Sequence, residues 1–175
     1  MATMILLPNA DGTTHVQWVD VGESSHYDCL DDDNAATSYV KCSVDGKRMV
    51  IEYANPSVAE ADIASIESVR FLSSGKANHR TDPSVVSISF EAPTAGFAEA
   101  VSYDAHRTNF ETINGTARTT SDGSSAWTYS DLENLEIRCT KVATVEVYLS
   151  YLALEVTYTE GVAVSDNSVF FGANF

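Results

Sequence analysis

The stretch VEVYLSYLALEVTY, residues 145–158, decides the fold class of this 175-residue chain. Apolar side chains occupy every second position in its first half, and the alternation continues in its second half with the parity shifted by one residue. Its β-branched and aromatic residues favour a strand over a helix. A β-bulge near Ser150 accounts for the shift in parity, and a strand that is buried on both faces accounts for it equally well.

Shorter runs of the same kind fill much of the remaining chain and are separated by turn residues. They cover residues 38–44, 47–53, 66–72, 85–91, 98–106, 110–119 and 137–142. The first two flank Asp45-Gly46, a dipeptide that is the strongest short signal for a hairpin. The run at 66–72 is expected to end at the turn-forming residues Ser73-Ser74-Gly75.

One segment carries a helical signal. Ser130 lies three residues before Glu133, which is the spacing of a capping box and predicts one or two helical turns at 131–136. Roughly eight strands without βαβ spacing indicate an all-β fold, an antiparallel jelly-roll-type β-sandwich with one short helix. The period of two predicts which side chains of the strands point inward. They are Val86, Ile88, Phe90, Ile137, Cys139, Val145 and Val147.

The chain divides into an N-terminal arm at 1–12, a β-sandwich domain at 13–160 and an apolar C-terminal tail at 161–175. Three cysteines, an odd number without a close pair, are expected to be small buried hydrophobic residues. The first eight residues are too short for a signal peptide, and no apolar run approaches the roughly 18 residues of a membrane helix. Folding in a reducing cytoplasm is the simplest interpretation.

Acidic residues dominate the charge. Ten Lys and Arg stand against 25 Asp and Glu, which gives a net charge of −15. Such a surface repels phosphate backbones and anionic membranes, so neither nucleic acid nor a membrane is expected as a partner.

No motif indicates catalysis or a bound cofactor. The chain has no G-x-S-x-G elbow, no P-loop and no dinucleotide-binding glycine pattern, and no two of its four histidines have zinc-ligand spacing. Chance pairs among the 25 acidic residues leave glycoside hydrolysis open without selecting one pair. The chain is therefore expected not to be an enzyme.

Two further features have alternative interpretations. Asp31-Asp32-Asp33-Asn34 is either a solvated loop, which is favoured, or a cation site that lacks EF-hand spacing. Trp18, Trp127 and Tyr129 lie near turns. These rings either plug the ends of the core, which is favoured, or stack on sugar rings.

The order of these features resembles a group of small virion structural proteins of tailed bacteriophages, over about residues 6 to 160. The similarity rests on short segments that follow one another in the same order. They are Pro8-Asn9-Ala10-Asp11-Gly12 before Trp18, Asp31-Asp32-Asp33 before Tyr39-Val40, Ala126-Trp127-Thr128 before the acidic helix at 131–136, and the tyrosine-containing strand with Val147-Tyr148 and 154–158.

The resemblance implies a virion component with a jelly-roll-like fold. A charge of −15 opposes a position facing packaged DNA, so the outer capsid surface is the expected location, with assembly in the host cytoplasm. The predicted function is a capsid decoration (cement) protein that stabilises contacts between capsid subunits. Its expected partners are the major capsid protein and copies of itself, as a trimer. The alternative is a tail or fibre module that binds a host-surface carbohydrate. A third interpretation is a bacterial carbohydrate-binding module.

The tail at 161–175 carries the candidate subunit interface. Its only charged side chain is Asp166, and its apolar residues stand among Gly, Ser and Asn. The favoured interpretation is that the tail reaches a neighbouring subunit, and the alternative is that it folds back on its own sandwich. The candidate interface residues are Phe170, Phe171, Phe175, Val164 and Val169.

Overall fold

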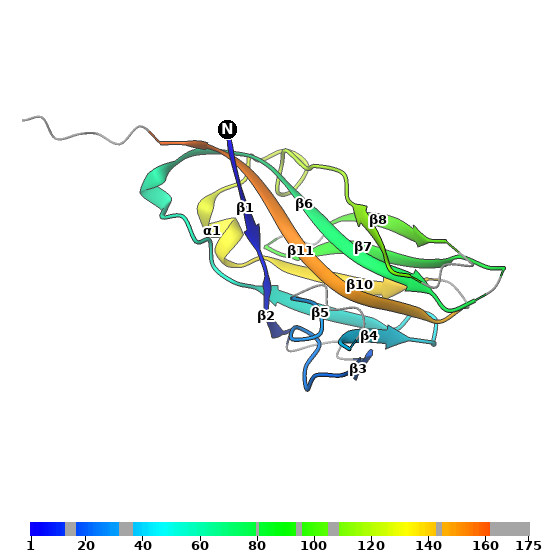
Figure 1. Cartoon of the computed structure of the whole chain (residues 1–175). Coiled ribbons are helices and arrows are strands. Elements are labelled where there is room, and N and C mark those ends of the chain that lie inside the picture. Colours follow the sequence, from blue (N-terminus) through cyan, green and yellow to red (C-terminus); the bar gives the residue numbers. More distant parts are fainter. Residues whose placement is uncertain are drawn as a thin grey trace, which may run out of the picture.

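The computed structural model describes residues 1–12, 17–31, 37–79, 81–93, 96–104, 109–142 and 145–161. They form two antiparallel β-sheets that pack against each other (Figure 1). Sheet A contains β1 (Ala2–Leu6), β3 (Val19–Val21), β4 (Tyr39–Cys42), β6 (Ile63–Ala77), β9 (Glu111–Asn114) and β11 (Val147–Glu160). Sheet B contains β2 (Pro8–Asp11), β5 (Arg48–Tyr53), β7 (Ser84–Ala92), β8 (Gly96–Tyr103) and β10 (Glu136–Lys141). A 3-10 turn, η1 (Glu60–Asp62), and one helix, α1 (Tyr129–Glu133), complete the elements.

The strand order is that of a jelly roll. Sheet A has the order β3-β4-β11-β6-β9 and sheet B the order β2-β5-β10-β7-β8. From β4 to β11, every connection passes from one sheet to the other except the β7–β8 hairpin. Two interleaved Greek keys of this kind define the jelly roll, which confirms the predicted fold class.

The core lies between the sheets and contains the side chains that the sequence pattern places inward. All seven predicted inward residues are buried, at 8% relative exposure or less. The three cysteines are also buried and free, as predicted.

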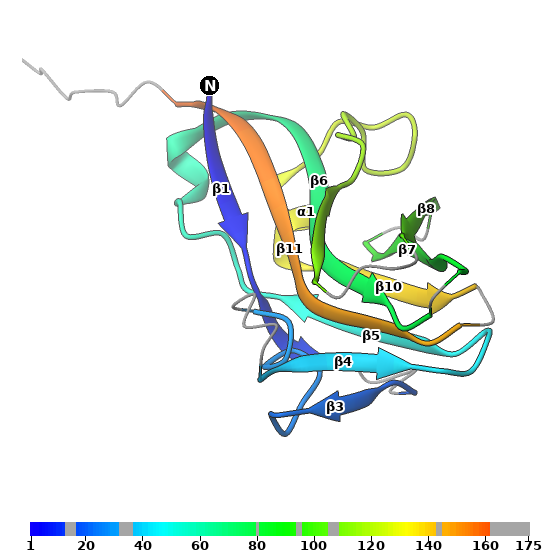
Figure 2. The ribbon, with the colours of Figure 1, turned by 45° about the vertical axis from the view of Figure 1, so that its right-hand side comes forward.

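The decisive strand is β11, and its register is shifted between Leu149 and Tyr151, which confirms the predicted bulge at Ser150. On one edge β11 pairs with β6 along its length. Its other edge is shared by β4, opposite 147–149, and β1, opposite 154–158 (Figure 2). Between these two partners the Leu152 amide donates to the Leu30 carbonyl, at 3.0 Å. The Tyr53 hydroxyl donates to the Leu152 carbonyl, at 2.9 Å. Residues 152–154 are fully buried, so the middle of β11 is covered on both faces as well.

The hairpin prediction at Asp45-Gly46 is wrong. The turn exists, and Gly46 has a φ of 74°, but β4 belongs to sheet A and β5 to sheet B. The Gly46 amide donates to the Lys141 carbonyl at 2.9 Å, so the turn is attached to the end of β10. Local turn chemistry specifies a reversal of the chain, whereas the pairing of β4 with β11 and of β5 with β10 decides that the reversal crosses between sheets.

The predicted end of the strand at Ser73-Ser74-Gly75 is also wrong, because β6 runs through all three residues. Tyr103 fills the space that these small residues leave. Its hydroxyl donates to Ser73 Oγ at 2.9 Å, and a Cβ on Gly75 would stand 2.6 Å from the Tyr103 ring. Small residues here serve packing rather than a turn.

The start of the helix and the structure of the N-terminal segment differ from the predictions. Helix α1 begins at Tyr129 because Thr128, rather than Ser130, is its N-cap, in a capping box with Asp131. The first twelve residues, predicted as an arm, provide β1 to sheet A and β2 to sheet B. No helix among the described residues is long and apolar enough to cross a membrane.

A lysine side chain lies inside the core. Lys141 is fully buried, and its ammonium group has no hydrogen-bond partner among the residues that the structure describes. A buried polar group without a partner loses its hydration without compensation.

Substitution Gly75→Ala is expected to lower the free energy of unfolding by about 1–3 kcal/mol, because the added methyl group overlaps the Tyr103 and Leu149 side chains. Urea denaturation measures the change. Ser68→Ala, at a half-buried position of the same strand, is the control, and its free energy of unfolding should stay within about 0.5 kcal/mol of that of the parent protein. Equal stability of the two variants would contradict the packing role of Gly75.

Substitution Lys141→Met is expected to raise the free energy of unfolding by about 1–3 kcal/mol, because an unbranched apolar chain replaces a buried ammonium group without a partner. The half-buried Lys47 provides the control variant Lys47→Met, for which no gain is expected. A loss of stability in Lys141→Met would show that the ammonium group has a stabilising partner.

Candidate functional site

Three aromatic rings gather on the outer face of sheet A. Tyr39 on β4 and Tyr148 on β11 alternate with buried neighbours, so the pleat turns both rings outward. The Tyr39 ring centroid lies 5.3 Å from that of Tyr148 and 6.2 Å from that of Phe110. We call this surface the Tyr148 face. It consists of Tyr39, Lys41, Lys76, Asn78, Phe110, Glu146 and Tyr148.

Two lysines flank Tyr148 on the neighbouring strands. Lys41 on β4 and Lys76 on β6 are its direct partners in the register, so the three side chains share a face. The Lys76 ammonium lies 4.7 Å from the Phe110 ring centroid and 5.3 Å from the Tyr148 ring centroid. This is the geometry of cation–π attraction, which orders the lysine side chain over the rings.

A hydrogen-bond chain fixes the Tyr148 ring. Asn78 Nδ2 donates to the Tyr148 hydroxyl at 2.8 Å and to Glu146 Oε2 at 3.0 Å, and the hydroxyl donates to the same Glu146 oxygen at 2.6 Å. Burial and the adjacent Glu146 raise the pKa of Tyr148 above its usual value. Burial works to raise the pKa of Glu146, but the bonds from Tyr148 and Asn78 and the charge of Lys41 outweigh it and hold that pKa below the ordinary value. Glu146 is therefore an ionised acceptor near neutral pH.

An acidic cleft of about 360 Å³ lies at the end of sheet B, beside α1. Glu52 and Glu136 line it and are direct cross-strand partners. Burial, followed by the charges of Glu52 and Glu91, raises the pKa of Glu136. No three His, Cys, Asp or Glu residues in the described ranges are arranged to hold a metal ion. The cleft therefore brings together carboxylates that repel one another.

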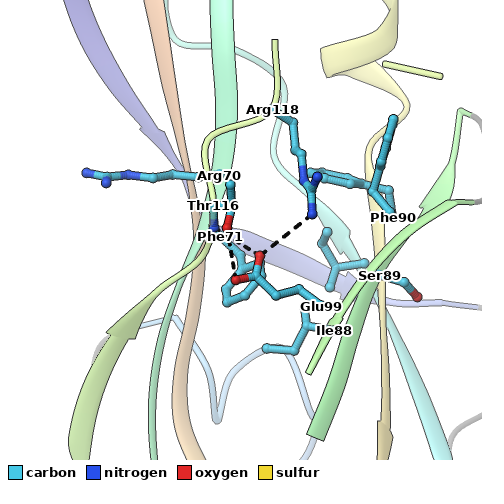
Figure 3. A pocket seen from close by; sticks show the side chains of 10 residues that line it. Arg70, Phe71, Ile88, Ser89, Phe90, Glu99, Thr116 and Arg118 are labelled. Atoms are coloured by element: carbon cyan, nitrogen blue, oxygen red, sulfur yellow. Dashed lines mark hydrogen bonds and ion pairs between the residues drawn. The ribbon is translucent and has the colours of Figure 1, made fainter. Parts of the chain in front are cut away.

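A second, shallow space lies between the sheets near β8 and has no room for a water-sized sphere (Figure 3). Glu99 of β8 closes it. Its carboxylate accepts hydrogen bonds from the Thr116 amide at 2.9 Å and the Thr116 hydroxyl at 3.1 Å, and lies 3.9 Å from the Arg118 guanidinium. The Arg118 guanidinium also lies 5.1 Å from the Phe97 ring centroid. These contacts tie the segment after β9 to sheet B, so the space is a closed seam and not a ligand site.

The aromatic residues singled out from the sequence lie elsewhere. Trp18 and Trp127 are 5% and 4% exposed, and their indole groups donate to the carbonyls of Lys47 and Arg118. Tyr129 is half-buried, and its hydroxyl donates to the Val58 carbonyl at 3.0 Å. The two tryptophans therefore plug the core, as favoured. Sequence reasoning missed Tyr148 as a site residue. The alternation that predicts Val147 and Leu149 to be buried also predicts that Tyr148, between them, points outward.

Of the remaining candidate residues from the sequence, the structure describes some and not others. His26 is buried, with Nδ1 3.2 Å from Asp11 and 3.3 Å from Asp20, and its Nε2 lies 3.0 Å from the Trp18 carbonyl oxygen, so it ties this corner together. Residues 32–34 of the acidic run lie outside the described ranges. The same holds for the whole candidate interface, namely Val164, Val169, Phe170, Phe171 and Phe175.

No protein-family model and no curated protein matches the sequence. Solved structures are similar to it in fold. One is the CBM36-1 domain of a multidomain xylanase from the hindgut metagenome of Trinervitermes trinervoides, with 12% identity, coverage of 89% of this chain and 97% of that chain, and a TM-score of 0.46. Another is a family two carbohydrate esterase from Cellvibrio japonicus, with 10% identity, coverage of 91% of this chain and 34% of that chain, and a TM-score of 0.38. A CBM4 structure has 12% identity, coverage of 81% of this chain and 95% of that chain, and a TM-score of 0.38.

Substitution Glu136→Gln is expected to raise the melting temperature at pH 7 by about 1–3 °C. The raised pKa means that the folded state favours the protonated carboxyl group. Stability is therefore lost as pH rises from the ordinary Glu range through the raised pKa, and the neutral amide avoids this loss. Thermal melts of both proteins between pH 3.5 and 7 test the sign. A gain that is largest at the acidic end would contradict it.

Proposed function

We propose that the chain is a non-catalytic domain that binds a carbohydrate on the Tyr148 face. The observation that carries the proposal is a set of partly exposed aromatic rings bordered by amide, carboxylate and ammonium groups. A sugar ring has faces of C–H groups and a rim of hydroxyl groups. Aromatic rings pack against the former, and planar polar side chains bind the latter.

The rigidity of the face supports this proposal. Tyr148 lies between the fully buried Val147 and Leu149, in the strand that is paired on both edges at this point. Its hydroxyl group is held by Glu146 and Asn78. A ring that is ordered before binding loses little entropy when the ligand arrives.

The chemistry of the face favours binding over catalysis. A general acid near neutral pH needs a raised carboxyl pKa, whereas that of Glu146 is lowered. Stacking on nucleic-acid bases is opposed by the net charge of −15.

This proposal matches the alternative predicted from the sequence, a tail or fibre module that binds a host-surface carbohydrate. The capsid decoration role rests on the resemblance and the net charge, and the trimer rests on the C-terminal segment at 161–175, of which the structure describes residue 161 alone. Both stay predictions.

The test is a glycan-binding screen of the full chain, followed by calorimetry with the best ligand. Substitution Tyr148→Ala is expected to weaken binding at least tenfold, since removal of a central aromatic contact costs about 1.5 kcal/mol or more. Tyr148→Phe keeps the ring and should bind more tightly than Tyr148→Ala.

The matched control is Tyr27→Ala, which removes another half-buried tyrosine away from this face and should leave affinity unchanged. Circular dichroism verifies that each variant is folded. Absence of glycan binding by the parent protein, or equal affinity of a folded Tyr148→Ala variant, would refute the proposal.

A further inference from the structure

We infer that the sugar bound on the Tyr148 face carries a carboxylate, which Lys76 and Lys41 recognise. This inference rests on the proposed function and adds the chemical class of the ligand. The residues that carry it are the three that form one row across the sheet, Lys41, Tyr148 and Lys76.

The spacing of this row suits one sugar ring. Neighbouring strands lie about 4.8 Å apart, so the two lysine backbones stand about 10 Å apart with Tyr148 midway between them. A pyranose ring that packs on Tyr148 therefore lies within reach of an ammonium group on either side. A carboxylate on the ring can meet one lysine, while the ring hydroxyl groups meet Asn78 or the other lysine.

Neither lysine forms an ion pair with another residue that the structure describes. Within the described residues no carboxylate lies within 4.0 Å of either ammonium group, although the chain contains 25 acidic residues and only ten basic ones. Two arginines of the strands behave differently. Arg70 pairs with Glu155 at 2.8 Å and Arg138 pairs with Glu91 at 2.7 Å. The charge of Lys76 is thus available to a ligand, and Lys41, whose charge also acts on Glu146, adds to the local positive potential.

Lys76 is also held in place before any ligand binds. Its ammonium group stands over the Phe110 and Tyr148 rings, which confine a flexible side chain. An ordered cation next to a stacking surface loses less side-chain entropy on meeting an anion than a freely rotating lysine does.

The charge of the face differs in sign from that of the chain. Two lysines stand against one glutamate on the Tyr148 face, whereas the whole chain carries −15. Glu146, the one acid, accepts bonds from Asn78 and Tyr148 and is also attracted by the charge of Lys41, which leaves Lys76 without a balancing acid on this face. A ligand with one isolated carboxylate gains this local attraction, while a dense polyanion meets the repulsion of the surrounding surface. Complementary charge therefore selects a mono-anionic sugar.

The experiment compares matched pairs of oligosaccharides that differ only at C6, with a carboxylate in one and a hydroxymethyl group in the other. The gluco, galacto and manno series are titrated into the full chain at 50 and 200 mM NaCl. At least one acidic member is expected to bind about tenfold more tightly than its neutral counterpart, and the preference should shrink at the higher salt concentration.

Substitution of Lys76→Gln together with Lys41→Gln is expected to abolish the preference for the acidic member while leaving weak binding of the neutral one. Lys47→Gln, which removes a lysine outside the Tyr148 face, is the control and should retain the preference. The single variants Lys41→Gln and Lys76→Gln, each expected to lose part of it, give the same readout if the double variant does not fold.

The outcomes separate this inference from the proposed function. If the parent protein binds acidic and neutral members equally, or if the lysine variants keep the preference, the inference is overturned and carbohydrate binding stands. If the lysine variants lose both ligands equally, the lysines support the rings rather than recognise charge, which also overturns it. If no member of any pair binds and the glycan screen is also negative, the proposed function itself fails.

Discussion

The pairing of β11 along both of its edges is the constraint on which the rest of the structure depends. One edge is taken entirely by β6, and the other is divided between β4 and β1. A straight strand that serves two different partners on one edge leaves a gap between them. The bulge at Ser150 occurs at this gap, and contacts from Leu30 and Tyr53 to Leu152 close it. Strands from both ends of the chain are thereby joined in one sheet.

The same constraint creates the Tyr148 face. Before the bulge, Val147 and Leu149 point into the core, and Tyr148 must point out. After the bulge the parity changes, and a stretch that is buried on both faces follows. The Tyr148 face therefore lies over the half of β11 that pairs with β4. Because Lys41 and Lys76 occupy the matching positions on the two neighbouring strands, the register alone brings a tyrosine between two lysines.

Charge is distributed unevenly over this acidic molecule. Three arginines join elements through carboxylates, as in the pairs Arg70–Glu155, Arg118–Glu99 and Arg138–Glu91. Such partly exposed pairs each contribute about 0–1 kcal/mol, so their main effect is to align side chains. The lysines of the Tyr148 face are left out of this network. These three guanidinium groups therefore make internal contacts, whereas Lys76 stands over aromatic rings on the surface of sheet A.

The sequence by itself determined the all-β class, the change of parity within β11, the burial of the cysteines and the inward faces of the strands. These features follow from local alternation, because a pleated strand turns successive side chains to opposite sides. Only the tertiary structure decided that Asp45-Gly46 connects different sheets and that β6 continues through Gly75. Both depend on partners distant in sequence, Lys141 and Tyr103 respectively. The Tyr148 face belongs to the second group. Its outward tyrosine is predictable from β11 alone. Its other residues come from distant segments, since Lys41 precedes Tyr148 by 107 residues, and only the tertiary structure brings Lys41, Lys76 and Phe110 to this tyrosine.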